Sequence, residues 1–575
     1  MTETQGFRLT RPSPTVQVHL PDGRTIEGPR GAPIEAFLQT VADSFPAPVV
    51  GAVVNNYLRE LTYPIEQEAE VRPITMADAD GARIYRRSLV FLLEVAFASM
   101  FPEAALTVDH SLVSGGYFCR VDGRNMLSPD ELRALEARMR GLTEKDLPIE
   151  RREVPLTEGI EYFRQRGQED KVRLLRHRKK NYLTLYCLDE YCDYLHGYMV
   201  PSTGYLRWFA LRPMSTGFVL SYPRRHRPVE VLPLEQPNKL LQTFQQYGDW
   251  LRRLGISTVG ALNDAVIDGR FQEIVLVSEA LHEQRIAEIA AMIADRRDEV
   301  RVVLIAGPSS SGKTTFSKRL AVQLLTHGIS PFPLEMDNYF VDRELTPRDE
   351  NGNYDFEHVD ALDRRFLAAH LQRLIQGERV RLPRYNFRLG RREEGEEVQL
   401  APGQLIILEG IHGMNPDLLP GFPRERTFRI YVSALTQLNL DRHNRVSTTD
   451  TRLLRRIVRD ARDRGYSARE TIAHWEMVRR GEKRWIFPFQ EEADVMFNSA
   501  LVYELAVLKP YAEPLLLQIP PSTPEWIEAK RLLALLEWFE PAPADWVPDD
   551  SLLREFIGGS ILRRFTLWRT SRGDV

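Results

Sequence analysis

Residues 307–314 carry the most specific chemical signal in the chain, the run Gly-Pro-Ser-Ser-Ser-Gly-Lys-Thr. An apolar, β-rich run precedes it at 301–306, and residues 315–325 follow with apolar side chains at helical spacing. A strand, a glycine loop and a helix start gather backbone N–H groups and the positive end of a helix around one anion. The pattern therefore predicts a nucleoside triphosphate site. A Gly- and Ser-rich turn that binds nothing is the alternative, and the two flanking elements disfavour it.

Within this loop, Lys313 is expected to reach the β- and γ-phosphates, and the Thr314 hydroxyl is expected to ligate Mg²⁺. The whole set expected to bind the nucleotide is Gly307, Pro308, Ser309, Ser310, Ser311, Gly312, Lys313, Thr314 and Thr315.

Two acids follow apolar runs further along the chain, each where a strand is expected to end. Glu409 closes the run 405–408 and could orient Mg²⁺ and its waters, while an acid that merely caps the strand is the alternative. Asp337 follows Leu334 by three residues and could accept the proton of an attacking hydroxyl near the metal. Its alternative is an N-cap acid that starts a loop. The first acid predicts a metal site, and the second predicts transfer to an alcohol.

Arginines on a predicted helix supply the cations that phosphoryl transfer needs. Arg452, Arg455, Arg456 and Arg459 follow i, i+3, i+4, i+7 spacing and would form one cationic stripe, with Arg464 beyond it. Such charges stabilise the γ-phosphate as its negative charge shifts to the leaving oxygen. A solvated basic helix face is the alternative.

At 575 residues the chain is too long for a single core, and a multi-domain protein mixing α/β and α+β regions is predicted. The expected segments are a ubiquitin-like module at 14–75, an α+β domain at 76–225, a helical connector at 226–298, an α/β domain with a doubly wound parallel sheet at 299–522, and a helical tail at 523–575. Particular elements expected are a hairpin around Pro21-Asp22-Gly23, helices at 88–99, 129–140, 239–254 and 279–297, and strands at 49–54, 182–188, 218–222, 405–408 and 428–432.

Composition narrows the class of protein. Charged residues make up 27% and the formal net charge is −4, so the sequence makes no case for a surface that coats nucleic acid. Three cysteines cannot build a disulfide framework, which favours a reducing compartment. Neither an apolar run of membrane-spanning length nor the apolar core of a signal peptide is present in the sequence, so a cytoplasmic protein is expected.

Five motifs in order, GPSSSGKTT, EMDNYF, DFEHVDALD, IILEGIH and DTRLLRRIVRDARDRG, resemble the uridine kinase/phosphoribulokinase group of P-loop kinases over roughly 300–500. The resemblance implies ATP and Mg²⁺ as cofactors, Asp337 as catalytic base and Glu409 as the metal-site acid. It further implies a role at the phosphates for Lys313 and Thr314. By the same match, the lid arginines are Arg456, Arg459 and Arg464, and the candidates for contact with the acceptor are Glu357 and Tyr385.

The acceptor half of the motif set departs from uridine kinases. Those enzymes carry a Tyr-Asp-Phe segment followed by a base-reading His, whereas this chain has Tyr385-Asn386-Phe387-Arg388 without one. The acid aligned with Glu357 is an Asp in those enzymes. Sharp acceptor choice rests on such hydrogen bonds, so the expected acceptor stays a nucleoside or a sugar-like molecule.

The first 225 residues resemble a different family. VHLPDGRTIEG looks like the TGS module of threonyl-tRNA synthetases, and 76–225 look like the second additional (editing) domain that follows it there. Arg87 and Phe91 stand where that family has two histidines, while Cys192 and His196 retain its second pair. Two ligands make a poor zinc site, so editing and metal binding at these positions are expected to be lost. A repurposed pocket for a nucleotide or an RNA end, with Arg87 facing an anion, stays open.

The function expected from these observations is transfer of the γ-phosphate of ATP to a hydroxyl of a nucleoside or sugar-like small molecule. An RNA- or tRNA-associated or regulatory P-loop ATPase, which uses nucleotide binding as a switch, is the alternative. The expected partners are the small-molecule acceptor and an RNA or nucleotide ligand at the N-terminal half. No membrane is expected as a partner, and the oligomeric state is left open.

Overall fold

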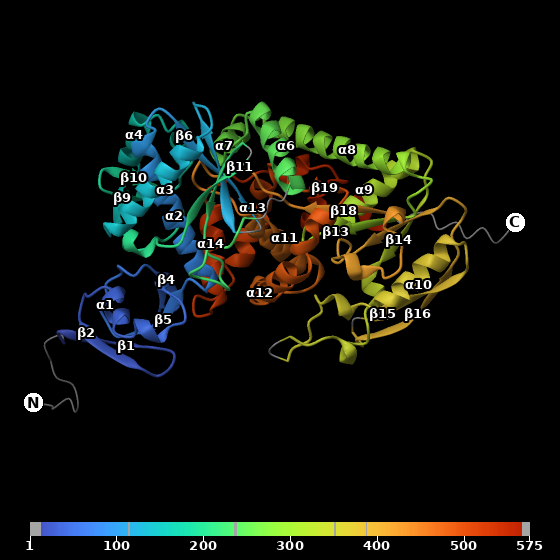
Figure 1. The fold of residues 1–575 in the computed structure, drawn as a ribbon, viewed down its shortest axis with the longest axis horizontal. Coiled ribbons are helices and arrows are strands. Elements are labelled where there is room, and N and C mark those ends of the chain that lie inside the picture. The colour runs from blue at the N-terminus through green and yellow to red at the C-terminus, as the bar shows by residue number, and fades with distance from the viewer. Residues whose placement is uncertain are drawn as a thin grey trace, which may run out of the picture. The chain divides into compact units, whose positions relative to one another are not determined.

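The computed structural model describes residues 13–112, 115–214, 216–234, 238–349, 352–386 and 388–565. The chain divides into two compact units (Figure 1). The first comprises 1–235 together with two short later segments, 441–445 and 521–527, and the second comprises 236–440, 446–520 and 528–575. The predicted fold class, α/β and α+β regions in one chain with a parallel sheet in the C-terminal part, is confirmed.

A small mixed sheet opens the first unit, in the order β2-β1-β5-β3-β4. The expected hairpin is present, because β1 and β2 pair antiparallel and Gly23 turns the chain with φ +86°. Helix α1 covers the sheet, and Val18, Phe37 and Val71 belong to its buried core. The elements are β1 (Thr15–His19), β2 (Thr25–Pro29), α1 (Ile34–Gln39), β3 (Val49–Val54), β4 (Tyr57–Arg59) and β5 (Ala69–Thr75).

Two further sheets and a long central helix complete the first unit. One sheet has the order β11-β12-β7-β6 and the other β10-β9-β8. The elements are α2 (Ala79–Met100), β6 (Ala105–Leu112), β7 (Gly116–Asp122), α3 (Pro129–Glu144), β8 (Glu150–Pro155), α4 (Leu156–Gln165), α5 (Glu169–Leu175), β9 (Tyr182–Leu188), β10 (Tyr191–Asp193), β11 (Ala210–Met214) and β12 (Gly217–Ser221).

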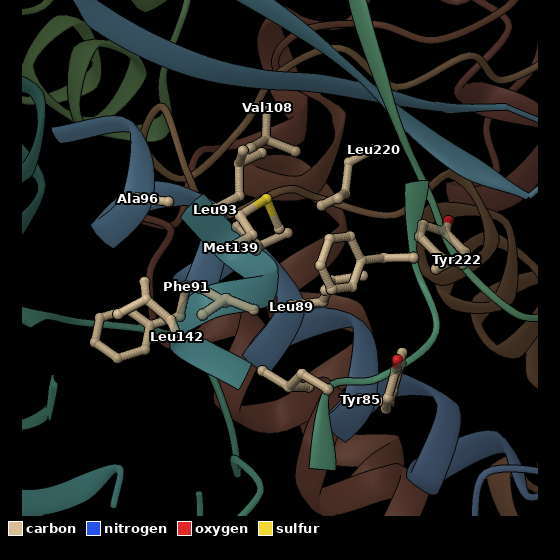
Figure 2. Close-up of a cluster of buried hydrophobic side chains, with 14 of the residues drawn as sticks. Tyr85, Leu89, Phe91, Leu93, Ala96, Val108, Met139, Leu142, Leu220 and Tyr222 are labelled. Atoms are coloured by element: carbon tan, nitrogen blue, oxygen red, sulfur yellow. The ribbon is translucent and has the colours of Figure 1, made fainter. Parts of the chain in front are cut away.

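Helix α2 is longer than the 88–99 predicted, because its apolar face runs along its whole length. Leu89, Leu93 and other side chains of α2 pack against Met139 of α3 and against Val108 and Leu220 of the neighbouring sheet (Figure 2). Helix α3 begins at a capping box in which Ser128 and Glu131 satisfy each other's backbone N–H groups, as its sequence pattern requires.

The segment 441–445 belongs to the first unit although it lies between elements of the second in the sequence. The backbone carbonyl of Arg442 accepts a hydrogen bond from the Val108 N–H at 2.8 Å, which joins the segment to β6 at one point. The guanidinium of Arg442 pairs with Asp170 at 3.2 Å. Sequence reasoning placed this segment wholly within the C-terminal domain.

The second unit is built on a parallel sheet with the order β14-β17-β13-β18-β19, in which every pairing is parallel. Its strands carry buried apolar runs, as expected for a sheet covered on both faces. A separate antiparallel hairpin, β15-β16, follows α10 in the chain.

Its strands are β13 (Val302–Ala306), β14 (Pro331–Glu335), β15 (Val380–Asn386), β16 (Arg391–Val398), β17 (Leu405–Glu409), β18 (Thr427–Ser433) and β19 (Val495–Asn498). Its helices are α6 (Asn238–Leu254), α7 (Val259–Ile267), α8 (Phe271–Asp295), α9 (Lys313–Thr326), α10 (Arg364–Ile375), α11 (Thr448–Asp463), α12 (Ala468–Trp485), α13 (Glu504–Leu516) and α15 (Arg554–Ile557), and α14 (Glu525–Leu536) begins in the segment assigned to the first unit.

The tail after residue 528 packs within the second unit, and Leu552 is buried in the same core as Val303 of the central strand and Phe316 of α9. Residues 566–575 of the predicted tail lie outside the described residues. Among the helices of the described ranges, none is both long and apolar enough to cross a membrane.

Candidate nucleotide-binding and phosphoryl-transfer site

The loop between β13 and α9 needs both of its glycines. A Cβ on Gly307 would lie 1.9 Å from the carbonyl oxygen of Val432, and a Cβ on Gly312 would lie 1.8 Å from the side chain of Leu552. Gly312 also has φ +85°, a conformation that L side chains rarely adopt. The loop is therefore held against β18 on one side and against the C-terminal segment on the other, and α9 starts immediately after it.

Lys313 folds back over this loop. Its Nζ donates to the carbonyl oxygens of Gly307 at 3.1 Å and Pro308 at 3.2 Å. Burial lowers the pKa of the ammonium, and the nearby carboxylates of Glu409 and Glu555 act in the opposite direction. A partly desolvated cation of this kind interacts strongly with an anion placed beside it.

Thr314 and Glu409 come together as the sequence predicts. The Thr314 hydroxyl donates to Oε1 of Glu409 at 3.0 Å, across from the end of β17. Burial raises the pKa of Glu409 to about 7, although the positive charge of Lys313 lowers it. A hydroxyl and a carboxylate are the hard oxygen donors that Mg²⁺ prefers, so the two residues fit the ion that the fold implies.

Asp337 lies just after β14, the strand next to β17 in the sheet. Its side chain stays accessible to water, yet the protein packed around it raises its pKa, and the charge of Glu335 adds to the effect. The charges of Lys313 and Arg464 lower the same pKa. Asp337 is thus placed in the electrostatic field of Lys313, the predicted phosphate-binding lysine, and of Arg464, one predicted lid arginine.

The arginines of the predicted stripe all lie on α11, but they differ in burial and form two groups. Arg452 and Arg455 are fully buried (1% and 0% exposed) and hold the loop from behind. The first donates to the carbonyl oxygen of Ser309 at 2.9 Å, and the second donates to that of Ser310 at 3.4 Å. They are structural cations, because each is also paired with a buried acid.

Arg456, Arg459 and Arg464 remain partly exposed, with the side chain of Arg464 at 51%. All three pair with the buried Asp460, at 3.2, 2.8 and 3.5 Å. Arg456 also donates to the Ser309 hydroxyl at 2.7 Å, which places it at the loop. Their partial exposure fits the predicted role of these three residues as lid arginines.

Two buried acids that pair with the inner arginines were missed by sequence reasoning. Glu482 of α12 pairs with Arg452 and, at 2.8 Å, with Arg479, and it accepts the Ser309 N–H at 3.1 Å. Glu504 of α13 pairs with Arg455 at 2.6 Å. The separations along the chain, 173 residues between Ser309 and Glu482, leave no local pattern that could have revealed these contacts.

The C-terminal segment also reaches the loop. Glu555 of α15 accepts hydrogen bonds from the backbone N–H of Thr315 at 3.1 Å and from its hydroxyl at 2.9 Å. The carboxylate thereby satisfies one of the N–H groups at the start of α9, where a negative charge is stabilised. Gly558 follows with φ +94°, and a Cβ there would lie 3.0 Å from the Arg462 guanidinium, so this glycine allows close packing within the unit.

The two acceptor-contact candidates lie near the other site residues. Glu357 packs against Gly481 of α12, and the charges of Arg456 and Lys313 act on its carboxyl. The backbone N–H of Tyr385 donates to the Asn338 side chain, next to Asp337, at 3.2 Å. Phe387 of the same motif lies outside the described residues.

The unusual acid Glu357 predicts a pH dependence of stability. Burial and the like charge of Glu482 raise the pKa of its carboxyl to about 7, above the value of 4.5 that an unfolded chain gives. The folded form therefore keeps a proton that the unfolded form has released, and the free energy of unfolding falls as pH rises from about 4.5 through 7. Glu409, whose pKa is also raised to about 7, contributes a slope of the same sign. We therefore expect Glu357→Gln to reduce the slope by its own share, about 1–3 kcal/mol, in thermal unfolding scans from pH 5 to pH 8. Equal slopes for both proteins would contradict the prediction.

The four editing-like positions of the first unit make contacts within the fold. Phe91 is fully buried in the apolar core, and Arg87 donates to the backbone carbonyl of Tyr198 at 2.7 Å. Cys192 forms a disulfide with Cys187, its partner across β9 and β10, and so offers no thiolate to a metal. The backbone N–H of His196 donates to Asn444 at 2.9 Å. Because two of the three cysteines are paired, cysteine usage no longer supports a reducing compartment.

Comparison with known proteins agrees with both predicted resemblances. Residues 302–506 match the model of the phosphoribulokinase/uridine kinase family. The N-terminal region matches threonine–tRNA ligases: that of Coxiella burnetii is 28% identical over 206 residues, and that of Symbiobacterium thermophilum is 30% identical over 200. These matches cover 36% and 35% of this chain and 31% of each ligase. The C-terminal region is thus similar to this family of kinases, and the chain spans under a third of the length of the ligases it matches.

Solved structures add little. A possible uridine kinase from Bacillus stearothermophilus is 21% identical, with 36% of this chain and 100% of that chain covered and a TM-score of 0.24. D-glycerate 3-kinase from Cryptococcus neoformans is 18% identical, with 46% and 89% covered and a TM-score of 0.19. Likeness at this level supports no argument about the acceptor.

Proposed function

We propose that the protein transfers the γ-phosphate of ATP to a hydroxyl of a nucleoside or sugar-like small molecule. The observation that carries the proposal is the position of Asp337, at the end of the strand beside β17 and in the field of Lys313. A nucleotide switch has no use for an acid placed to accept the proton of an alcohol. The match of 302–506 to a kinase family supports the same reading.

Each predicted site residue would have its own role in phosphoryl transfer. Lys313 and the loop N–H groups would hold the β- and γ-phosphates, and Thr314 with Glu409 would hold Mg²⁺, which neutralises charge on the phosphates when bound. Asp337 would take the proton of the acceptor hydroxyl. Arg456, Arg459 and Arg464 would stabilise the transferred group, and Glu357 and Tyr385 would contact the acceptor.

An acceptor panel tests the proposal. The full chain is incubated with ATP, Mg²⁺ and separate nucleosides, sugars, sugar acids, ribose phosphates and tRNA, and the products are separated by mass. A phosphorylated small molecule is the expected result. Phosphate release that RNA stimulates, with no phosphorylated acceptor, would overturn the proposal in favour of an RNA-associated ATPase, the role that the similarity to tRNA ligases favours.

A cytoplasmic location of the protein remains a prediction.

A further inference from the structure

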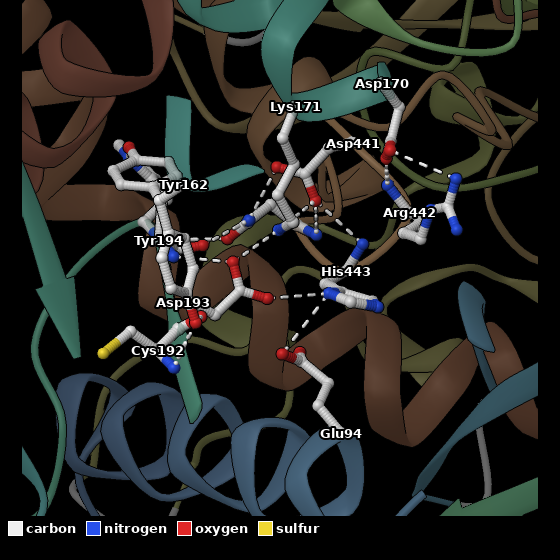
Figure 3. Close-up of polar contacts among 12 residues, drawn as sticks. Glu94, Tyr162, Asp170, Lys171, Cys192, Asp193, Tyr194, Asp441, Arg442 and His443 are labelled. Atoms are coloured by element: carbon white, nitrogen blue, oxygen red, sulfur yellow. Dashed lines mark hydrogen bonds and ion pairs between the residues drawn. The ribbon is translucent and has the colours of Figure 1, made fainter. Parts of the chain in front are cut away.

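The first unit contains a buried cluster that neither the kinase site nor the editing-like pair uses. Glu94 of α2, Asp193 of β10 and His443 of the segment 441–445 bring one ligand atom each to within 4.8 Å of one another (Figure 3). All three are buried, at 2%, 0% and 7% exposure. They come from distant parts of the sequence, so no motif could have revealed them.

The side chain of Glu94 is the first sign that this cluster suits a cation. Among the residues that the structure describes, neither of its carboxylate oxygens accepts a hydrogen bond, and Oε2 faces Nδ1 of His443 at 3.3 Å. A buried carboxylate without donors costs several kcal/mol unless a cation or a proton accompanies it. Its side chain points into the cluster in Figure 3.

The fixed charges around the cluster do not balance. Glu94, Asp193 and Asp441 are three buried carboxyl groups, and Lys171 supplies one cation, at 2.8 Å from Asp193 and 3.3 Å from Asp441. With a neutral imidazole at His443 the group is two positive charges short. One divalent cation would supply both, and without one the cluster would need two protons.

The spacing of the ligand atoms suits a metal ion. Bonds of about 2.0–2.2 Å to nitrogen and oxygen place neighbouring ligand atoms roughly 3.0–3.5 Å apart. Nδ1 of His443 lies 2.9 Å from Oδ2 of Asp193 and 3.3 Å from Oε2 of Glu94. The other oxygen of Asp193 accepts from Lys171 and from the backbone N–H of Tyr194, which orients the carboxylate as an outer partner does in metal sites.

We propose that Glu94, Asp193 and His443 bind one divalent transition-metal ion, with Zn²⁺ as the reference ion. One imidazole and two carboxylates leave a coordination position for water, and this donor set suits zinc and its neighbours better than Mg²⁺. The site is distinct from Cys192 and His196, the pair inherited with the editing-like fold. It would tie down the segment that the chain enters from β18 and leaves into α11.

Metal content and spectra test the site directly. Untagged full-length protein is stripped with a chelator, equilibrated with Zn²⁺ without nucleotide, and passed through a desalting column before metal analysis. We expect about one Zn²⁺ per chain and a rise in the unfolding temperature of the first unit. Co²⁺ in place of Zn²⁺ should give visible absorption bands typical of nitrogen and oxygen ligands.

Two isosteric variants locate the ion. Glu94→Gln keeps the shape of the side chain and should lose the bound Zn²⁺ and the cobalt bands. Glu409→Gln, the matched change at the kinase site, should keep both. Loss in Glu409→Gln alone would place the ion at the nucleotide site and overturn the proposal.

A variant that folds poorly does not obscure the result, because the wild-type protein is itself decisive. If stripped wild-type protein retains no Zn²⁺, gives no cobalt bands and shows no change in unfolding temperature, the cluster is held by two protons and the metal site does not exist. The outcome is independent of the proposed kinase function, since no nucleotide or acceptor is present.

Discussion

We expect Asp337→Asn to lower the turnover number about 100- to 10,000-fold and to leave the KM for ATP nearly unchanged. The reason is that the amide can no longer accept the acceptor's proton, while the groups that hold the nucleotide stay in place. The loop contacts of Lys313 and the pairing of Thr314 with Glu409 do not involve Asp337. Steady-state kinetics with the acceptor found by the panel separates the two parameters.

Glu335→Gln is the matched control, because it removes the same charge two residues earlier. Glu335 is exposed and raises the pKa of Asp337 through its charge. We expect its loss to shift the acid limb of the rate profile to lower pH, with turnover at neutral pH within a few-fold of the wild-type value. Two outcomes would contradict a base role for Asp337. One is that turnover falls as far in Glu335→Gln as in Asp337→Asn, and the other is that Asp337→Asn loses ATP affinity as much as turnover. Either would mean that negative charge near the end of β14 matters, and not a proton acceptor.

The sequence could predict those site residues that lie in the glycine loop or at the ends of strands. The glycine loop, Thr314 and Glu409 follow from a local pattern and from the rule that parallel strands end on one edge of a sheet, and the structure brings them together. Helical spacing also predicted that the arginines would share a helix. It could not show which of them face solvent, because periodicity does not reveal the acids that approach from other helices.

The features that the sequence could not predict depend on contacts between distant parts of the chain. Glu482 and Glu555 reach the loop from about 170 and 240 residues away. The segment 441–445 joins the first unit from within the C-terminal sequence. The start of α2 was predicted too late, at residue 88, because the most hydrophobic part of the helix begins there while its apolar face begins earlier.

Glu482→Gln should destabilise the second unit by about 3–5 kcal/mol. Arg452 is fully buried, with its guanidinium over the ring of Trp475 at 5.5 Å, and Glu482 is its partner. Removing one member of a buried ion pair leaves the other charge uncompensated in a medium that solvates it poorly. The Gln carbonyl can still accept the Ser309 N–H, so the change isolates the charge from the hydrogen bond.

Calorimetric unfolding of the full chain measures the loss, since the two units can unfold as separate transitions. Glu476→Gln, an exposed acid on the same helix, is the control and should stay within about 0.5 kcal/mol of the wild-type value. Equal stability of the Glu482→Gln variant would mean that the Ser309 carbonyl and the ring of Trp475 suffice to hold Arg452. In that case Arg452 would have charge to offer a phosphate, and the division between structural and phosphate-facing arginines would fail.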